Sequence, residues 1–118
     1  MNLPQYSHCQ PGLLLETVGD DREVFLQLVE IFMRESAEKC ELLRLAAAAA
    51  DFEQLGFQSH ALKGTVGPLG ARALVQMLLL MEDECGRKQC ICDAERISMI
   101  DEELSHVRRE MQQFIAHF

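Results

Sequence analysis

The C-terminal segment, residues 97–118, carries apolar side chains at alternating intervals of three and four residues without a break. These residues are Ile97, Ile100, Leu104, Val107, Met111, Phe114 and Phe118. The spacing puts all of them on one face of a long α-helix, and such a helix is stable in water only when that face is covered. The cover is either a second copy of the chain, in a coiled coil, or other helices of the same chain. Because three further amphipathic segments precede this one, we expect burial within one bundle and a monomer.

The rest of the chain divides into helical segments with short connections. We expect an irregular tail over residues 1–11, then helices over 12–18, 21–49, 51–67, 71–85 and from 93 to the C-terminus. Helices joined by short connections lie antiparallel to their neighbours. At 118 residues the chain is long enough for one domain with its own core. The sequence therefore predicts an all-α fold, an antiparallel up-down four-helix bundle over residues 12–118 with a short extra N-terminal helix.

Capping residues mark the expected helix boundaries. Asp20, with Glu23 three residues later, has the spacing of a capping box and is expected to begin the second helix. Asp51, with Gln54 three residues later, is expected to begin the third. Pro68 lacks a backbone N–H and disfavours helical geometry at the residue before it, so the third helix should end there.

The charge balance excludes several classes of partner. A net charge of −8 leaves no basic patch of the density that nucleic acid or an anionic membrane surface requires. The first residues carry no basic segment followed by an apolar run, and the apolar runs are far too short to span a membrane. We therefore expect a cytoplasmic protein with no nucleic-acid or membrane partner.

The cysteines are expected to be reduced thiols. They are Cys9, Cys40, Cys85, Cys90 and Cys92. An odd number of cysteines without a secretion signal favours free thiols, and Cys40 and Cys85 fall on helical core stripes. Cys90 and Cys92, with Cys85 and His8 or Cys9, would be a conceivable zinc cluster, but the spacing matches no usual zinc motif. We expect no metal site, with a metal- or redox-responsive bundle as the alternative use of these residues.

One histidine stands on a surface without bulky side chains. His60 lies away from the apolar side of its helix, and its nearest neighbours on the same face are Gly56, Lys63, Gly64 and Gly67. Glycine inside a helix is less favourable than alanine by about 1 kcal/mol, so three of them together need a physical reason. Close packing of a neighbouring helix is one reason. The other is clearance, so that a large group can reach the imidazole.

Lys63 favours the second reason. An exposed cation one turn from the ring suits an anion carried on that ring. Histidine is also the side chain whose neutral, nucleophilic form is well populated near pH 7. His8, His106 and His117 have no glycine neighbours of this kind, so His60 is the candidate nucleophile.

The same residues resemble a known signature. His60-x-x-Lys63-Gly64, continuing through Gly67, Leu69, Gly70 and Ala71 to Leu74, is similar to the motif of the histidine-containing phosphotransfer (HPt) domains of phosphorelays. The resemblance covers roughly residues 12–115, although its specific part is about a dozen residues. It implies a four-helix bundle whose central histidine accepts a phosphoryl group from the aspartyl phosphate of one receiver domain and passes it to another.

The resemblance also implies roles for individual residues. His60 would carry the phosphoryl group, Lys63 would offset its charge, and Gly64, with Gly56 and Gly67, would provide clearance. A glutamate placed as Glu82 is would accept a hydrogen bond from Nδ1–H of the ring, which leaves Nε2 free to attack phosphorus.

The helix expected over residues 71–85 is apolar over more of its circumference than one core stripe needs. Val75 and Leu79 lie beside that stripe. They are either buried deep in the bundle or part of an exposed docking surface next to the histidine. We assign Ala61, Val75 and Leu79 to partner binding.

The function predicted from the sequence is that of a phosphohistidine carrier. Its partners would be receiver domains of hybrid sensor kinases and of response regulators. The chain contains no nucleotide-binding glycine motif, so we expect no kinase activity of its own. By the resemblance it needs no cofactor of its own, since Mg²⁺ and an acidic pocket would come from the receiver. The alternative is a non-catalytic helical adaptor or chaperone that uses the apolar patch around Val75 and Leu79.

Overall fold

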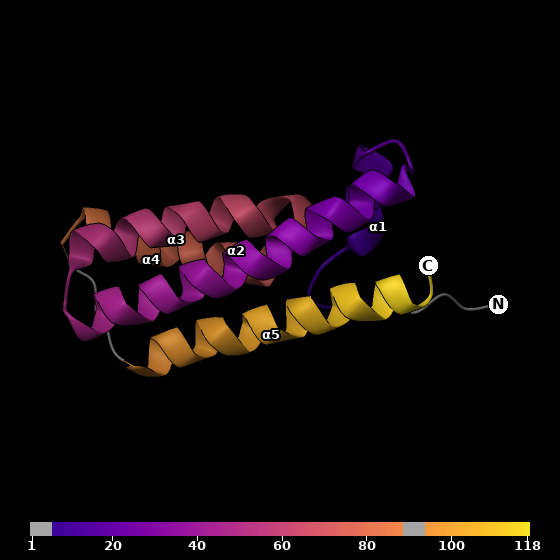
Figure 1. The fold of residues 1–118 in the computed structure, drawn as a ribbon. Helices are drawn as coiled ribbons and strands as arrows, with labels where there is room; N and C mark the ends of the chain where they lie inside the picture. The colour runs from indigo at the N-terminus through magenta and orange to yellow at the C-terminus, as the bar shows by residue number, and fades with distance from the viewer. Residues whose placement is uncertain (1–5, 89–93) are drawn as a thin grey trace.

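The structure, a computed structural model, describes residues 6–88 and 94–118, and all regular secondary structure in those ranges is helical. The helices are α1 (Pro11–Thr17), α2 (Arg22–Ala48), α3 (Phe52–Val66), the 3₁₀ turn η1 (Gly67–Leu69), α4 (Arg72–Gly86) and α5 (Ala94–Ala116). The expected four-helix bundle with a short extra N-terminal helix is confirmed (Figure 1). The last helix was expected to begin near Asp93, which lies outside the described residues.

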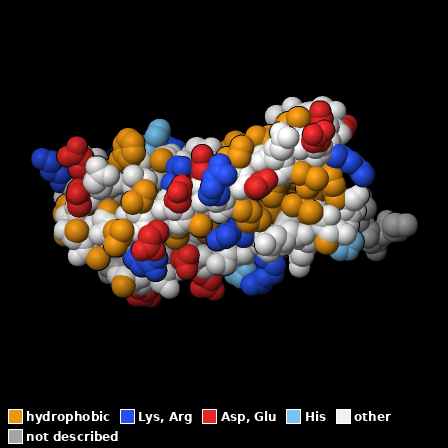
Figure 2. Space-filling view, in the orientation of Figure 1, with side chains coloured by type: hydrophobic (Ala, Val, Ile, Leu, Met, Phe, Trp, Pro, Cys, Tyr) orange, Lys and Arg blue, Asp and Glu red, His pale blue; other side chains and the backbone are white. Residues whose placement is uncertain are grey.

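The bundle is elongated, with extents of 48 × 25 × 19 Å. Helix α3 packs chiefly against α4 and α2, and α5 lies along α2 and α4 (Figure 1). Helix α1 lies at the end of the bundle where α5 finishes, against η1. Charged side chains of both signs are scattered over the face drawn in Figure 2, without a basic patch there.

The N-terminal cap of α3 agrees with the sequence prediction, whereas the N-terminal cap of α2 differs from it by one residue. Asp51 caps α3 as expected, because its side chain accepts a hydrogen bond from Gln54 N–H at 3.1 Å. Asp21, rather than Asp20, caps α2 and accepts from Val24 N–H at 3.1 Å. The physical reason is the backbone: Asp20 has φ of 62° and follows a glycine with φ of 67°, so the chain first reaches the extended geometry of a cap one residue later.

The apolar stripe of α5 forms one side of the core. Its members Ile97, Ile100, Leu104, Val107 and Met111 are buried, and Phe114 and Phe118 are partly buried. Burying one such side chain stabilises the fold by roughly 1.5–3 kcal/mol. The stripe is therefore covered by helices of the same chain, as the sequence analysis expected. Pro68 ends α3 as predicted, since the chain passes at Gly67 into a 3₁₀ turn.

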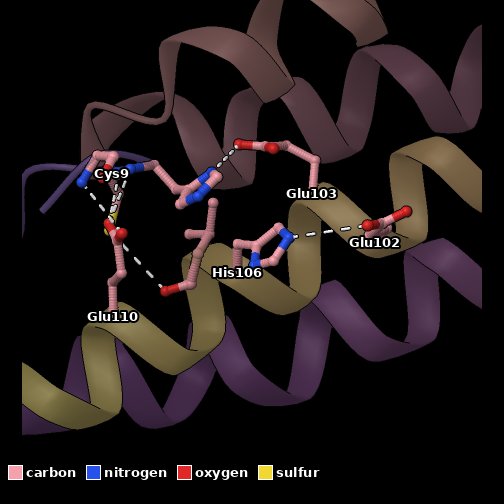
Figure 3. A network of polar contacts seen from close by, with 8 residues as sticks. Cys9, Glu102, Glu103, His106 and Glu110 are labelled. Atoms are coloured by element: carbon pink, nitrogen blue, oxygen red, sulfur yellow. Dashed lines mark hydrogen bonds and ion pairs between the residues drawn. The ribbon is translucent and has the colours of Figure 1, made fainter.

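Residues 6–10, which are the described part of the expected irregular tail before α1, form no helix but are packed against the bundle. Glu110, 9% exposed on α5, accepts hydrogen bonds from the backbone N–H groups of Ser7, His8 and Cys9 at 3.0, 2.8 and 3.0 Å (Figure 3). The ring of His8 lies 2.8 Å from Glu103 and stacks on His106, with ring centroids 4.4 Å apart. Residues 7–9 are thus attached to α5, which the sequence analysis did not foresee.

None of the described cysteines, Cys9, Cys40 and Cys85, is joined in a disulfide. Burial, with the nearby Glu110 carboxylate, raises the pKa of Cys9 to about 12. Burial, followed by a hydrogen bond to Asp101, raises the pKa of Cys40 to about 11. Among the described helices, none combines the length and hydropathy needed to span a bilayer.

Candidate functional site

His60 lies in the middle of α3 with most of its ring in solvent. The side chain is 68% exposed, whereas its neighbour Ser59 is fully buried and donates a hydrogen bond to the carbonyl of Leu55 at 2.7 Å. Leu55 and Leu62, which flank His60 on α3, are also fully buried. The backbone that carries the ring is therefore fixed by core packing on both sides, while the ring itself is open to a partner.

Helix α4 brings a carboxylate to this ring. Glu82 Oε1 lies 2.7 Å from His60 Nδ1, and Glu82 Oε2 lies 2.7 Å from Lys63 Nζ. The three side chains form one network across the α3–α4 contact, with Glu82 in the middle. The structure thus brings together the three residues that the sequence analysis assigned to the chemistry.

The charge of Glu82 determines the tautomer of the ring. The hydrogen bond from Lys63, opposed in part by desolvation and assisted by His60, holds the pKa of Glu82 below its usual range. An ionised carboxylate can only accept hydrogen bonds, so the 2.7 Å contact requires a proton on His60 Nδ1. In the neutral ring Nε2 then keeps its lone pair. A neutral imidazole fixed in this way is a nucleophile at Nε2.

Lys63 differs from the expectation of an exposed cation. Its side chain is only 25% exposed, and its ammonium is paired with Glu82. The exposure of Lys63 is lower than expected because Glu82 reaches from α4 to a position between His60 and Lys63. The periodicity of α3 alone does not predict this contact. In this arrangement Lys63 keeps Glu82 ionised and in place.

The three glycines of the His60 face fall into two kinds. A Cβ added at Gly64 or Gly67 would have no atom within 4 Å, so both positions leave open space. A Cβ added at Gly56 would lie 3.1 Å from Cys85 Cβ on α4. Gly64 and Gly67 therefore provide clearance, whereas Gly56 allows α3 and α4 to pack closely.

An open depression of about 520 Å³ lies next to the ring. Its lining includes His60, Glu82, Gly56 and the aromatic side chains of Phe52 and Phe57. Phe57 is 64% exposed, which is unusual for so large an apolar side chain. Phe57 was not among the site residues predicted from the sequence. The available signal was an aromatic residue three positions before His60 that lies off the buried stripe of α3.

The residues assigned to partner binding have different environments. Leu79 is 43% exposed, with Leu80 beside it, whereas Val75 is partly buried against the core and Ala61 is half-buried. Leu79 and Leu80 line a second, shallower depression on α4 with Gln76 and Asp83. The interpretation that the whole apolar face of α4 is deeply buried is therefore wrong for Leu79 and partly right for Val75.

The residues considered for zinc are only partly within the described chain. Cys90 and Cys92 lie outside the described residues. Within residues 6–88 and 94–118, no group of three or more His, Cys, Asp or Glu side chains is arranged to hold a metal ion. His8 and Cys9 instead take part in the attachment of the N-terminal segment to α5.

Comparison with known families shows which family the chain belongs to. The sequence model of the Hpt domain family matches residues 27–116, which include α3, α4 and the whole His60 network. The chain belongs to the Hpt domain family. Hpt domains are phosphotransfer carriers of phosphorelays in two-component signalling, and they are not kinases.

A solved Hpt structure has the same fold. The crystal structure of histidine-containing phosphotransfer protein B (HptB) from Pseudomonas aeruginosa PAO1 is similar to this chain with a TM-score of 0.85 and 21% sequence identity. The match covers 97% of this chain and 99% of the HptB chain. At that identity the likeness concerns the fold alone. No curated protein sequence matches the chain.

Proposed function

We propose that this Hpt domain carries a phosphoryl group on His60 Nε2 between receiver domains. One observation carries the proposal: an exposed imidazole whose Nδ1–H is held at 2.7 Å by a carboxylate with a lowered pKa. The Nε2 lone pair attacks the phosphorus of an aspartyl phosphate, a P–N bond forms, and the P–O bond to the aspartate breaks. The aspartate leaves as a carboxylate, and the same steps run in reverse toward a second receiver.

Glu82 acts on the charge that this transfer creates. Attack through Nε2 while Nδ1 keeps its proton leaves positive charge on the ring, and the Glu82 carboxylate already in contact with Nδ1 stabilises it. Lys63 holds the second oxygen of Glu82 and adds a positive charge near the ring, which offsets the charge of the bound phosphoryl group. Gly64 and Gly67 leave the space through which the receiver approaches.

The receiver would supply the rest of the chemistry. A metaphosphate-like transition state is stabilised by a metal ion and by positioned charges, which we propose are the Mg²⁺ and the acidic pocket of the receiver. The partners would be receivers of hybrid sensor kinases and of response regulators, met by a monomeric carrier. We place this exchange in the cytoplasm, because Cys9 and Cys40 are free thiols, as is usual in reducing compartments.

A label-transfer experiment tests the proposal. Receiver domains carrying labelled aspartyl phosphate are mixed with the wild-type protein, with His60→Gln and with His117→Gln. His117 is an exposed histidine near the end of α5 and serves as the matched control. We expect the wild-type and His117→Gln proteins to accept label and His60→Gln to accept none while keeping its helicity. Labelling of His60→Gln would contradict the assignment, and failure of every protein to accept label would favour the adaptor alternative, which the exposed Leu79 and Leu80 support.

A further inference from the structure

Helices α3 and α4 approach each other closely at Gly56 and Cys85. A Cβ at Gly56 would lie 3.1 Å from Cys85 Cβ, a distance at which one of the two helices has to yield by a few tenths of an ångström. Cys85 is buried, with 8% of its surface exposed. Elsewhere on the His60 face, Gly64 has no such neighbour within 4 Å. Gly56 therefore has a packing partner that Gly64 lacks.

This contact lies one helical turn from the site. Gly56 precedes His60 by four residues on α3, and Cys85 follows Glu82 by three residues on α4. Because the two helices are antiparallel, a step from Gly56 to His60 and a step from Cys85 to Glu82 run in the same direction. The Gly56–Cys85 contact is thus the layer directly adjacent to the His60–Glu82 contact.

We infer that Gly56 and Cys85 act as a spacer that sets the distance between α3 and α4 at which Glu82 reaches Nδ1 of His60. Both are positioning residues, since neither bears the phosphoryl group. The His60–Glu82 contact has little room to adjust, because Glu82 Oε2 is already held by Lys63 at 2.7 Å. A side chain at position 56 pushes α4 outward and lengthens the contact to Nδ1. The inference rests on the proposed role of His60.

Substitutions on the two helices separate this role from ordinary packing. Gly56→Ala adds one Cβ to a contact that has no room for it, and Gly56→Val adds a larger side chain. The double variant Gly56→Ala with Cys85→Gly places the Cβ on α3 in place of α4, removes the thiol of Cys85 and restores the space. Gly12→Ala is the control, because a Cβ at that helical glycine in α1 would have nothing within 4 Å.

The first measurement is the tautomer of the His60 ring, read from its ¹⁵N chemical shifts in the unphosphorylated protein. We expect the wild-type, Gly12→Ala and double variants to keep the proton on Nδ1. Gly56→Val should shift toward the tautomer mixture of a free imidazole, with Gly56→Ala between them. The second measurement is the phosphotransfer rate, which should fall on the order of 10–100-fold in Gly56→Val, since a misplacement of about 1 Å can have an effect of that size. The double variant should recover most of the rate lost in Gly56→Ala.

Thermal melting recorded on the same variants distinguishes the outcomes. If the Gly56 variants melt at lower temperature but keep the wild-type tautomer and transfer rate, Gly56 is a packing residue only and the inference is overturned. It is also overturned if the double variant restores nothing. If Gly56→Val does not fold, Gly56→Ala and its rescue carry the test. The tautomer is measured without any receiver, so this inference can fail while phosphotransfer is intact, and it can succeed while the receiver assay fails.

Discussion

One buried carboxylate accepts the three backbone hydrogen bonds that attach residues 7–9 to α5, so its removal should have a large effect on stability. Glu110 accepts three backbone N–H groups at 2.8–3.0 Å and is 9% exposed (Figure 3). A hydrogen bond to a charged group contributes about 1.5–3 kcal/mol, but the three bonds are not additive, because the segment can detach and expose its N–H groups to water. Detachment exposes Cys9, which is 2% exposed, and breaks the 2.8 Å hydrogen bond from Gln10 N–H to the Leu69 carbonyl.

We therefore expect Glu110→Ala to lower the free energy of unfolding by about 2–4 kcal/mol. For a domain of this size that corresponds to a fall in Tm of roughly 8–16 °C. Glu110→Gln should have a smaller effect, because its amide oxygen still accepts while its NH₂ faces one of the N–H donors.

The assay is thermal and urea unfolding followed by circular dichroism, with hydrogen exchange at residues 7–9. The matched control is Glu102→Gln on the same helix, because Glu102 is 74% exposed and lies 3.9 Å from His106. Exposed pairs of this kind contribute about 0–1 kcal/mol. Unfolding of Glu110→Ala at the same temperature as Glu102→Gln, with unchanged amide protection at residues 7–9, would refute the reasoning.

Three further predictions concern the site and the thiols. Gly64→Leu should transfer phosphate more slowly with an unchanged or higher Tm, since its Cβ meets nothing within 4 Å; equal losses of rate and Tm would contradict this. The wild-type protein should melt at a higher temperature than Glu82→Gln, with the full difference present above about pH 4.5, the ordinary pKa of a glutamate. This difference in Tm should disappear as the pH falls through the lowered pKa of Glu82. A Tm difference that does not change across pH 3–7 would be evidence against it. Cys9 and Cys40, with pKa values of about 12 and 11, should react slowly with a thiol reagent near pH 8 until the protein unfolds, and rapid reaction of the folded protein would exclude this.

The bundle was predictable because its signals are local. The three-and-four spacing of apolar residues in α5 requires that this face be covered, whatever covers it. Asp51 caps α3 by accepting a hydrogen bond from the residue only three positions later. Asp20 misled the cap prediction because two adjacent aspartates have equal capping ability. The positive φ values that decide between them depend on the turn as a whole.

The network at His60 was only partly within reach of the sequence. The glycine-lined face identified His60 itself, but the contact with Glu82 joins residues 22 positions apart on different helices. Resemblance to a family predicted that contact, whereas spacing along α3 could not. Lys63 was expected to be an exposed cation for the same reason, since its partner lies on α4.

The attachment of residues 7–9 to α5 was missed because the residues that form it are even farther apart in the sequence. Glu110 binds backbone N–H groups 101–103 residues away, and a backbone N–H has no side-chain identity that a sequence pattern could reveal. One indication was present. Glu110 lies three residues after Val107 and directly before Met111, at the edge of an otherwise apolar stripe, where an acidic residue needs a partner.

The most direct measurement is to locate the phosphoryl group on the wild-type protein. After incubation with phosphorylated receiver domains, the protein is digested at alkaline pH and the modified residue is identified by mass spectrometry. We predict a single phosphoryl group on His60 that is lost in acid and stable in alkali, as a phosphoramidate is. A phosphoryl group on any other residue, or an acid-stable modification, would contradict the assignment of His60 as the carrier.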